Sequence, residues 1–179
     1  LGLHYSHSRE EKQSQPGTEG IENSQIRLTD GSIIFTPNLF GPGITVNEVD
    51  YRMSSVDAGV KYKGLSLEGE YYWRWLSNFT GLNTSGIANI NDHGYQLQTS
   101  AMVVPKALQL YLGASQIFGR FGDQWEVRAG ENWYVMKERG IRLNGELMYV
   151  NRSPVGYTAY PYPVGAKGVV FHINLEMNF

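Results

Sequence analysis

The sequence lacks cysteine, long apolar runs and any excess of positive charge, and each absence excludes a class of protein. Without cysteine there are no disulfides, thiolate zinc sites or thiol catalysis. No stretch of about 20 apolar residues is present, which excludes a helical membrane span. The formal net charge is −2, so the basic face that a nucleic-acid-binding protein needs is not expected.

What the sequence has in quantity is glycine and aromatic residues. It contains 21 glycines and 12 tyrosines among 179 residues, and aromatic residues make up 13% of the chain. This composition is typical of an all-β protein that is rich in turns and interfacial rings. The mean hydropathy of −0.34 does not argue against a membrane protein, because a transmembrane barrel places its lipid-facing residues at only every second position.

The last eleven residues alternate strictly between apolar and mostly polar side chains, which predicts a strand with one apolar face. This terminal strand resembles the C-terminal assembly signal of bacterial outer-membrane β-barrel proteins. The residues that carry the resemblance are Phe171, Ile173, Leu175, Met177 and Phe179. An ordinary strand of a soluble β-sandwich is the alternative for these residues taken alone.

Similar alternation recurs along the chain and predicts about eight strands. The predicted strands lie at 1–6, 55–62, 65–75, 95–103, 108–115, 125–135, 141–149 and 169–179. The connections that we expect to be short are 63–64, 105–106 and 136–140, and those that we expect to be long are 9–50, 76–92 and 153–168. Only the loop near 118–123 departs from this alternation of short and long. Outer-membrane barrels have short periplasmic turns and longer extracellular loops.

Aromatic residues gather near both ends of the predicted strands, as interfacial girdles do. Those expected near the periplasmic interface are Tyr62, Trp133 and Phe179, and those expected near the outer interface are Tyr5, Trp73, Trp75, Tyr95, Trp125, Tyr149 and Phe171. Phe171 and Phe179 are separated by roughly 26 Å of strand at about 3.3 Å per residue, close to the height of an apolar band. The sequence therefore predicts an all-β, antiparallel, up-and-down transmembrane β-barrel in a single domain, 1–179, with a long extracellular loop at about 9–50.

Several segments resemble the C-terminal half of porins in the phosphate-selective porin superfamily. They are Glu22–Gly31, Val56–Gly64, Gly69–Leu76, Asn132–Tyr134 and Asn151–Gly156. The resemblance implies a 16-stranded barrel that trimerises, of which this chain would be the half that follows a missing part before Leu1. The rival is a complete, closed eight-stranded barrel with a structural or anchoring role and an unidentified envelope partner, whose interior is just wide enough for side chains to fill.

The polar face of the predicted strands would line an aqueous channel in a porin, because charged groups cannot lie buried and unpaired. The predicted pore-lining residues are Asp57, Lys61, Glu68, Glu70, Arg74, Gln96, Gln98, Glu126, Arg128, Arg142, Glu146, His172 and Glu176. Their signs are mixed and no nucleophile accompanies them, so we expect neither an enzyme nor a strongly anion-selective wall. The histidines are too scattered to predict a metal site, and no cofactor is expected.

Two features of the sequence leave alternatives open. Glu131 falls on the lipid-facing parity, where a subunit contact, a bulge or an interfacial depth would each accommodate a carboxylate. The long loop at 9–50 contains β-prone stretches at 32–35 and 43–46, which suggest a hairpin that either narrows the pore or caps its mouth.

These expectations combine into one functional prediction. The chain is expected to be a porin of the bacterial outer membrane that allows passive diffusion of small hydrophilic solutes or ions. Its expected partners are outer-membrane lipid and lipopolysaccharide, the barrel assembly machinery and two further copies of itself in a homotrimer.

Overall fold

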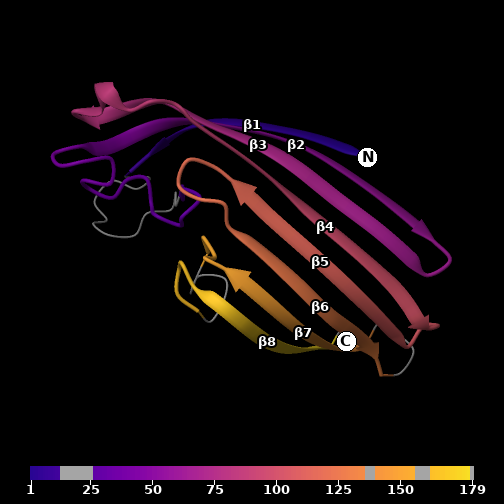
Figure 1. Ribbon diagram of the computed structural model, residues 1–179. Coiled ribbons are helices and arrows are strands. Elements are labelled where there is room, and N and C mark those ends of the chain that lie inside the picture. Colours follow the sequence, from indigo (N-terminus) through magenta and orange to yellow (C-terminus); the bar gives the residue numbers. More distant parts are fainter. Residues whose placement is uncertain (13–25, 136–139, 156–161, 178–179) are drawn as a thin grey trace.

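A computed structural model describes residues 1–12, 26–135, 140–155 and 162–177, which form one antiparallel sheet (Figure 1). Its strands are β1 (Gly2–Glu11), β2 (Thr45–Tyr62), β3 (Leu65–Leu82), β4 (Ile90–Val104), β5 (Leu108–Phe118), β6 (Trp125–Tyr134), β7 (Ile141–Asn151) and β8 (Lys167–Met177). A short 3-10 helix, η1 (Thr84–Gly86), lies between β3 and β4. None of the described helical residues forms a helix that is long and apolar enough to cross a membrane.

Each strand pairs with its neighbours in the sequence, so the sheet order is β1-β2-β3-β4-β5-β6-β7-β8. The prediction of eight antiparallel, up-and-down strands is confirmed. Within the described ranges the sheet is not closed, and β1 and β8 are its two edges. Phe179, the last residue of the predicted assembly signal, lies outside the described residues.

Two of the three predicted short turns form where the sequence predicted them, and the third, at 136–140, lies largely outside the described residues. Lys63 and Gly64 both have positive φ angles, of 47° and 85°, between β2 and β3. Two consecutive residues with positive φ match the right-handed twist of a hairpin, and this explains why a glycine stands at the second position. The β4–β5 turn lies at Pro105 and Lys106, where Lys106 also has a positive φ of 62°.

The connections at one end of the sheet are 63–64, 105–107 and 135–140, and those at the other end are 12–44, 83–89, 119–124 and 152–166. The first set is shorter than the second, except that 135–140 and 119–124 have the same length. We call these two ends of the sheet the short-turn end and the long-loop end.

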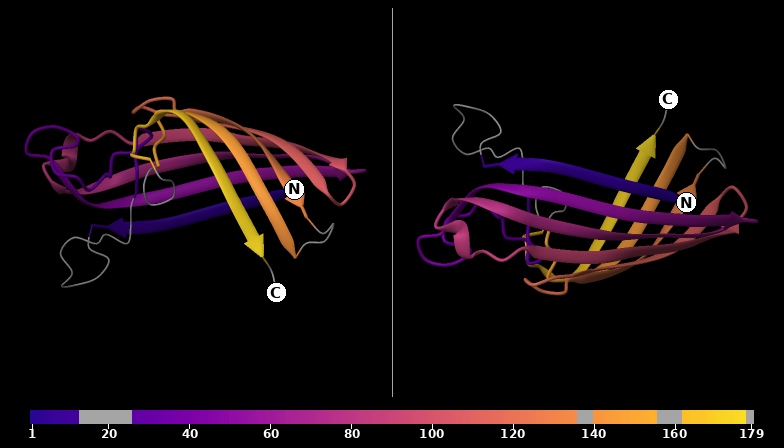
Figure 2. Two further views of the ribbon diagram at one scale, coloured as in Figure 1. Left: turned by 90° about the horizontal axis from the view of Figure 1, so that it is seen from below. Right: turned by 90° about the horizontal axis from the view of Figure 1, so that it is seen from above.

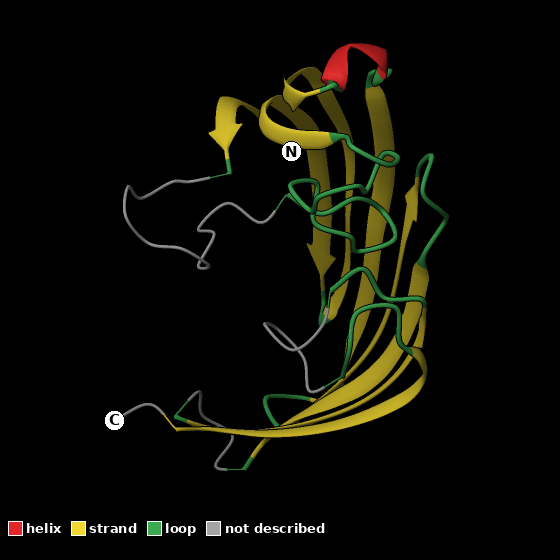
Figure 3. Ribbon diagram, turned by 90° about the vertical axis from the view of Figure 1, so that its left-hand side faces the viewer, coloured by secondary structure: helices red, strands yellow, loops and turns green. Residues whose placement is uncertain are grey.

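The sheet is strongly twisted and curved. Figure 2 shows the strand direction turning steadily from β1 to β8, and Figure 3 shows that the strands wrap around a concave side on which loops lie. Side chains that point to this concave side form the inner face, and those that point away form the outer face. The distinction matters because the two faces differ in composition.

β2 and β3 are longer than the alternation predicted, which corrects the bounds of two expected loops. β2 begins at Thr45 rather than near residue 55, and β3 continues to Leu82 rather than to Trp75. Near the long-loop end the pattern reverses, because the inner face carries buried apolar residues such as Val49 and Leu76. Register irregularities in β2 between Val46 and Asp50 disturb the period further.

The described part of the long loop, 26–44, packs against the inner face at the long-loop end, and we call it the inner segment. Its side chains Leu28, Ile34 and Phe35 are almost fully buried, and they form one apolar cluster with inner-face residues. The strand residues of this cluster are Val46, Val49, Leu76 and Ile90. The inner segment therefore folds toward the concave side of the sheet.

The inner segment contains a small hairpin that reaches across the concave side. Arg27 pairs with Ile33, and the Leu28 amide donates to the Ser32 carbonyl at 2.8 Å. The predicted stretch at 32–35 thus pairs with the residues just before it and not with 43–46, which lead into β2. At the tip, Gly31 has a φ of 88°, and a Cβ placed there would lie 2.3 Å from Val164 and 2.8 Å from the Pro154 carbonyl oxygen. The hairpin thus connects the β2–β4 part of the sheet with the loop between β7 and β8.

Candidate functional site

The register of the sheet arranges inner-face side chains in rows that run across the strands. Residues directly opposite one another on neighbouring strands share a face, so pairing partners extend into a continuous row. The row at mid-height contains Asp57, Glu70, Gln96, Ser115 and Glu126. The structure therefore brings together several predicted pore-lining residues that lie far apart in the sequence.

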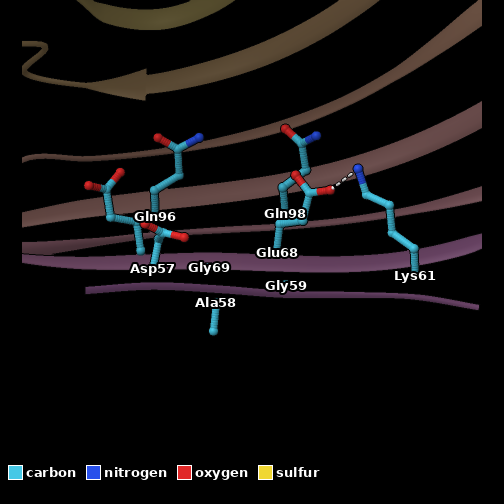
Figure 4. Close-up of a pocket in the computed structure, with 9 residues that line it drawn as sticks. Asp57, Ala58, Gly59, Lys61, Glu68, Gly69, Gln96 and Gln98 are labelled. Atoms are coloured by element: carbon cyan, nitrogen blue, oxygen red, sulfur yellow. Dashed lines mark ion pairs between the residues drawn. The ribbon is translucent and has the colours of Figure 1, made fainter. Parts of the chain in front are cut away.

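An open depression of about 580 Å³ lies over this part of the inner face. In Figure 4 the side chains of Asp57, Glu68, Gln96 and Gln98 project from the same face of the sheet, while that of Ala58 points away. Lys61 Nζ lies 2.7 Å from Glu68 Oε1, an ion pair across the β2–β3 hairpin.

The β2 end of the same row contacts β1. His4 Nε2 lies 2.8 Å from Asp57 Oδ1, and the two side chains are 65% and 44% exposed. Glu70 and Glu126 form no ion pair with any other residue that the structure describes. These two carboxylates therefore stand on the concave side without a cationic partner among the described residues.

Toward the short-turn end the inner face carries a continuous hydrogen-bonded network, which we call the polar belt. Its members, from β3 to β7, are Ser66, Ser100, Gln109, Asn132, Asn144, Tyr111 and Glu146. Their donor–acceptor distances range from 2.7 Å for Ser66–Ser100 to 3.1 Å for Asn132–Gln109. Apart from Glu146, these residues were not predicted as site residues, although all fall on the polar parity. Only the register shows that they form one network.

Two tyrosine side chains of the inner face, Tyr72 and Tyr111, each lie over a glycine on the neighbouring strand. A Cβ at Gly94 would lie 2.5 Å from the Tyr72 hydroxyl, and one at Gly130 would lie 2.4 Å from atoms of Tyr111. Contacts this short do not occur, so a side chain at either position would force a rearrangement. The glycines thus keep bulky groups close to the wall.

Arg74 and Asp92 form the most buried ion pair of the inner face. Arg74 Nε donates to Asp92 Oδ2 at 3.1 Å, and the two side chains are only 18% and 2% exposed. Arg74 also donates through Nη1 to the Arg27 carbonyl at 2.7 Å, which joins the pair to the inner segment. Arg74 therefore lies on the predicted face but contacts the inner segment, and little of it is open to solvent.

The remaining predicted residues are Arg128 on β6, opposite Gly113 in the register, and those on β7 and β8. Arg142 pairs with Glu176, and His172 is opposite Glu146 in the register. All of them are on the inner face, as their parity predicted.

The outer face is apolar and open to the surroundings. Leu112, Phe171 and Ile173 are 59%, 67% and 60% exposed, respectively. The whole set of exposed apolar side chains extends over every strand of the sheet, including the described residues of the predicted assembly signal on β8. Such an extended apolar surface is rare on a soluble monomer.

Aromatic rings concentrate on the outer face toward the long-loop end. Ring centroids lie 4.6 Å apart for Tyr71–Trp73, 5.0 Å for His93–Phe118 and 5.4 Å for Trp125–Tyr149. At the short-turn end, Tyr62 and Trp133 are exposed. Glu131 is exposed on the same outer face, opposite Leu110 in the register.

Beyond Trp75 the outer face becomes polar and hydrogen-bonded. Arg9 Nε donates to Glu48 Oε2 at 3.0 Å, and the Thr80 hydroxyl donates to the same oxygen at 2.9 Å. The hydrogen bonds from Arg9 and then Thr80 hold the pKa of the Glu48 carboxyl below its usual range. This polar zone marks where the apolar part of the outer face ends.

The described residues contain no group of three or more histidine, aspartate or glutamate side chains that could hold a metal ion. Comparisons with protein-family models, with curated proteins and with solved structures found no match for this chain. The proposed function therefore rests on the structure of the inner and outer faces of the sheet.

Proposed function

We propose that this chain is part of the wall of a porin in the bacterial outer membrane, a water-filled transmembrane β-barrel through which small hydrophilic solutes or ions diffuse. The observation that carries the proposal is the distribution of polarity over one curved sheet. Away from the long-loop end, the convex face is apolar and exposed, whereas the concave face is polar. A soluble sheet would bury its apolar face against other elements.

The polar concave face fits an aqueous channel. Its carboxylates, amides and guanidinium groups need water or each other as partners, and the polar belt and ion pairs supply only some of these partners. Glu70 and Glu126 would have water as their partner in a channel. No catalysis and no cofactor are part of the proposal.

The apolar convex face fits lipid. An outer-membrane barrel carries an apolar band about 25 Å tall between aromatic girdles. The outer-face rings and the polar zone beyond Trp75 provide such an upper boundary, with the long loops outside the cell and the short turns in the periplasm. Glu131, two residues from Trp133, would then lie near the periplasmic interface.

The open sheet supports a larger barrel over a closed one of eight strands. β1 and β8 each expose an unpaired edge among the described residues, and such edges are avoided or covered in stable proteins. Additional strands, as in a 16-stranded barrel of the phosphate-selective porin superfamily, would cover both. The alternative is a closed eight-stranded barrel with an anchoring role, and its closure would require β1 to pair with β8.

Conductance measurements on the natural full-length polypeptide test the proposal. Purified in detergent and added to planar lipid bilayers, it should produce stepwise currents that a heat-denatured sample does not. A folded, membrane-inserted protein that passes no current would instead favour the closed eight-stranded barrel.

Cell fractionation and cross-linking test the location and the expected homotrimer. The protein should be recovered with the outer membrane and its lipopolysaccharide, and cross-linking in mild detergent should give trimers. A protein found only as a monomer would remove the trimer from the proposal, together with a subunit contact at Glu131.

A further inference from the structure

We propose that Gly113 is a positioning residue that lets the Arg128 guanidinium lie down against the inner face, and that this position limits how strongly Arg128 attracts anions that pass through the channel. The inference rests on the proposed porin function and deepens it. It identifies which inner-face cation acts on passing ions, and which neighbouring residue controls how far that side chain extends into the channel.

Arg128 on β6 lies across the neighbouring strand β5 and reaches β4. In the register, Gln98, Gly113 and Arg128 are directly opposite one another on three successive strands. Arg128 Nη2 donates to Gln98 Oε1 at 3.3 Å. The side chain must therefore pass over Gly113 to make this contact.

Gly113 provides the space for that crossing. A Cβ at this position would lie 2.6 Å from Arg128 Nε, 3.0 Å from Cγ and 3.3 Å from Cδ. At Gly94 and Gly130, by contrast, a Cβ would also come within 2.6 Å of a backbone oxygen. A methyl group at residue 113 thus conflicts with a flexible side chain, so alanine there should displace Arg128 while the sheet stays intact.

Arg128 also differs from the other cations of the inner face in its charge environment. The permanently charged basic side chains on the inner face of the strands are Lys61, Arg74, Arg128 and Arg142. Lys61 pairs with Glu68, Arg74 with Asp92 and Arg142 with Glu176. Arg128 makes no ion pair within the described part of the chain, and its hydrogen-bond partner is a neutral amide.

An unpaired guanidinium in a channel wall acts on ions through its distance from their path. Coulomb energy varies inversely with separation, and low-dielectric walls focus the field into the water. A guanidinium lying along the sheet acts weakly, whereas one that projects into the channel attracts anions and repels cations more strongly. Gly113 keeps Arg128 in the first arrangement.

The test compares Gly113→Ala, Arg128→Gln and the double variant G113A/R128Q in the natural full-length polypeptide. Reversal potentials across bilayers that separate unequal KCl solutions give the permeability ratio of chloride to potassium. G113A should raise this ratio, on the order of twofold, and R128Q should lower it. In the R128Q background, G113A should have no further effect.

Two additional variants make the test specific. Gly145→Ala is the matched control on the outer face, because a Cβ there meets Glu131 only at an ordinary 3.6 Å, and it should leave the ratio unchanged. Gln98→Ala removes the amide that holds Arg128 without adding volume, so it should shift the ratio in the same direction as G113A even if G113A folds poorly.

The outcomes separate this inference from the proposed function. If the unmodified protein conducts but G113A and Gln98→Ala leave the ratio unchanged, Gly113 does not position Arg128 and only this inference fails. An equal shift by G113A with and without Arg128 also overturns it. An unmodified protein that inserts and passes no current refutes the channel itself, and the inference with it.

Discussion

The buried pair between Arg74 and Asp92 should hold the inner segment against the wall, and Arg74→Leu tests this. The substitution leaves the Asp92 carboxylate, whose side chain is only 2% exposed, without its cation. It also removes the donor to the Arg27 carbonyl. The protein can relieve this burial by letting the inner segment detach, so that water reaches Asp92.

The expected rise in the detached population follows from two free energies, the cost of leaving Asp92 without its partner and the stabilisation from the buried side chains of the inner segment. Removing one partner of a buried pair costs about 3–5 kcal/mol. Burial of Leu28, Ile34 and Phe35, which opposes detachment, contributes about 1.5–3 kcal/mol for each side chain. The segment should therefore remain mostly attached, while its detached population rises by about two to three and a half orders of magnitude, at 1.4 kcal/mol per tenfold.

Trypsin cleavage after Arg27 measures the detached population, because cleavage of a transiently open segment follows its equilibrium population when closing is fast. Arg74→Leu should accelerate cleavage strongly. The double variant R74L/D92N removes the buried charge as well and should recover most of the protection, leaving only the cost of about 1–3 kcal/mol for the lost hydrogen bond to the Arg27 carbonyl.

Arg142→Leu is the matched control, because the Arg142–Glu176 pair is exposed and lies away from the inner segment. Exposed pairs contribute little, so cleavage after Arg27 should not change. The reasoning is refuted if Arg74→Leu is cut as slowly as the unmodified protein, or if R74L/D92N is cut as fast as the single variant.

Three further predictions concern topology, assembly and pH. A cysteine in place of Asn83 should react with an impermeant thiol reagent on intact cells, whereas cysteines in place of Lys63 and Lys106 should react only after lysis; the reverse pattern would invert the topology. Deletion of Phe179 should sharply lower outer-membrane abundance while detergent-refolded protein stays folded, because the terminal strand is expected to be recognised during assembly by strand addition; normal abundance in fractionated cells would contradict this. Because the folded-state pKa of Glu48 is lowered, its stabilising contribution is present above the ordinary glutamate pKa and is lost as pH falls through the lowered value, so amide hydrogen exchange at the β1–β2 pair should accelerate there, and Glu48→Gln should remove that pH dependence.

The strands could be predicted from the sequence wherever apolar and polar residues alternate without interruption. The hairpin at Lys63–Gly64 and strands β5 to β8 have this regularity. The prediction failed for the upper parts of β2 and β3, because Val49 and Leu76 are apolar on the inner face, where the inner segment covers them. The contact with the inner segment, which is distant in the sequence, thus reverses the local alternation of apolar outer-face and polar inner-face residues.

The site was predictable as a face and not as a set of contacts. Parity alone assigned Arg74 and Arg128 to the same inner surface. It could not show that Arg74 is covered by the inner segment while Arg128 crosses Gly113 to reach Gln98, because both facts depend on the register of neighbouring strands. The polar belt was missed for the same reason, since serines and asparagines become a network only when five strands are aligned.

The contact of the hairpin tip with the β7–β8 loop has a consequence for engineering this surface. At Gly31 the backbone conformation and the atoms of Pro154 and Val164 leave no room for another side chain, so the two loops must be exchanged together if either is to be replaced. At Gly86 in η1 an added Cβ would meet no atom within 4 Å. A foreign peptide displayed on the long-loop end therefore belongs at Gly86, where it leaves both loops unchanged.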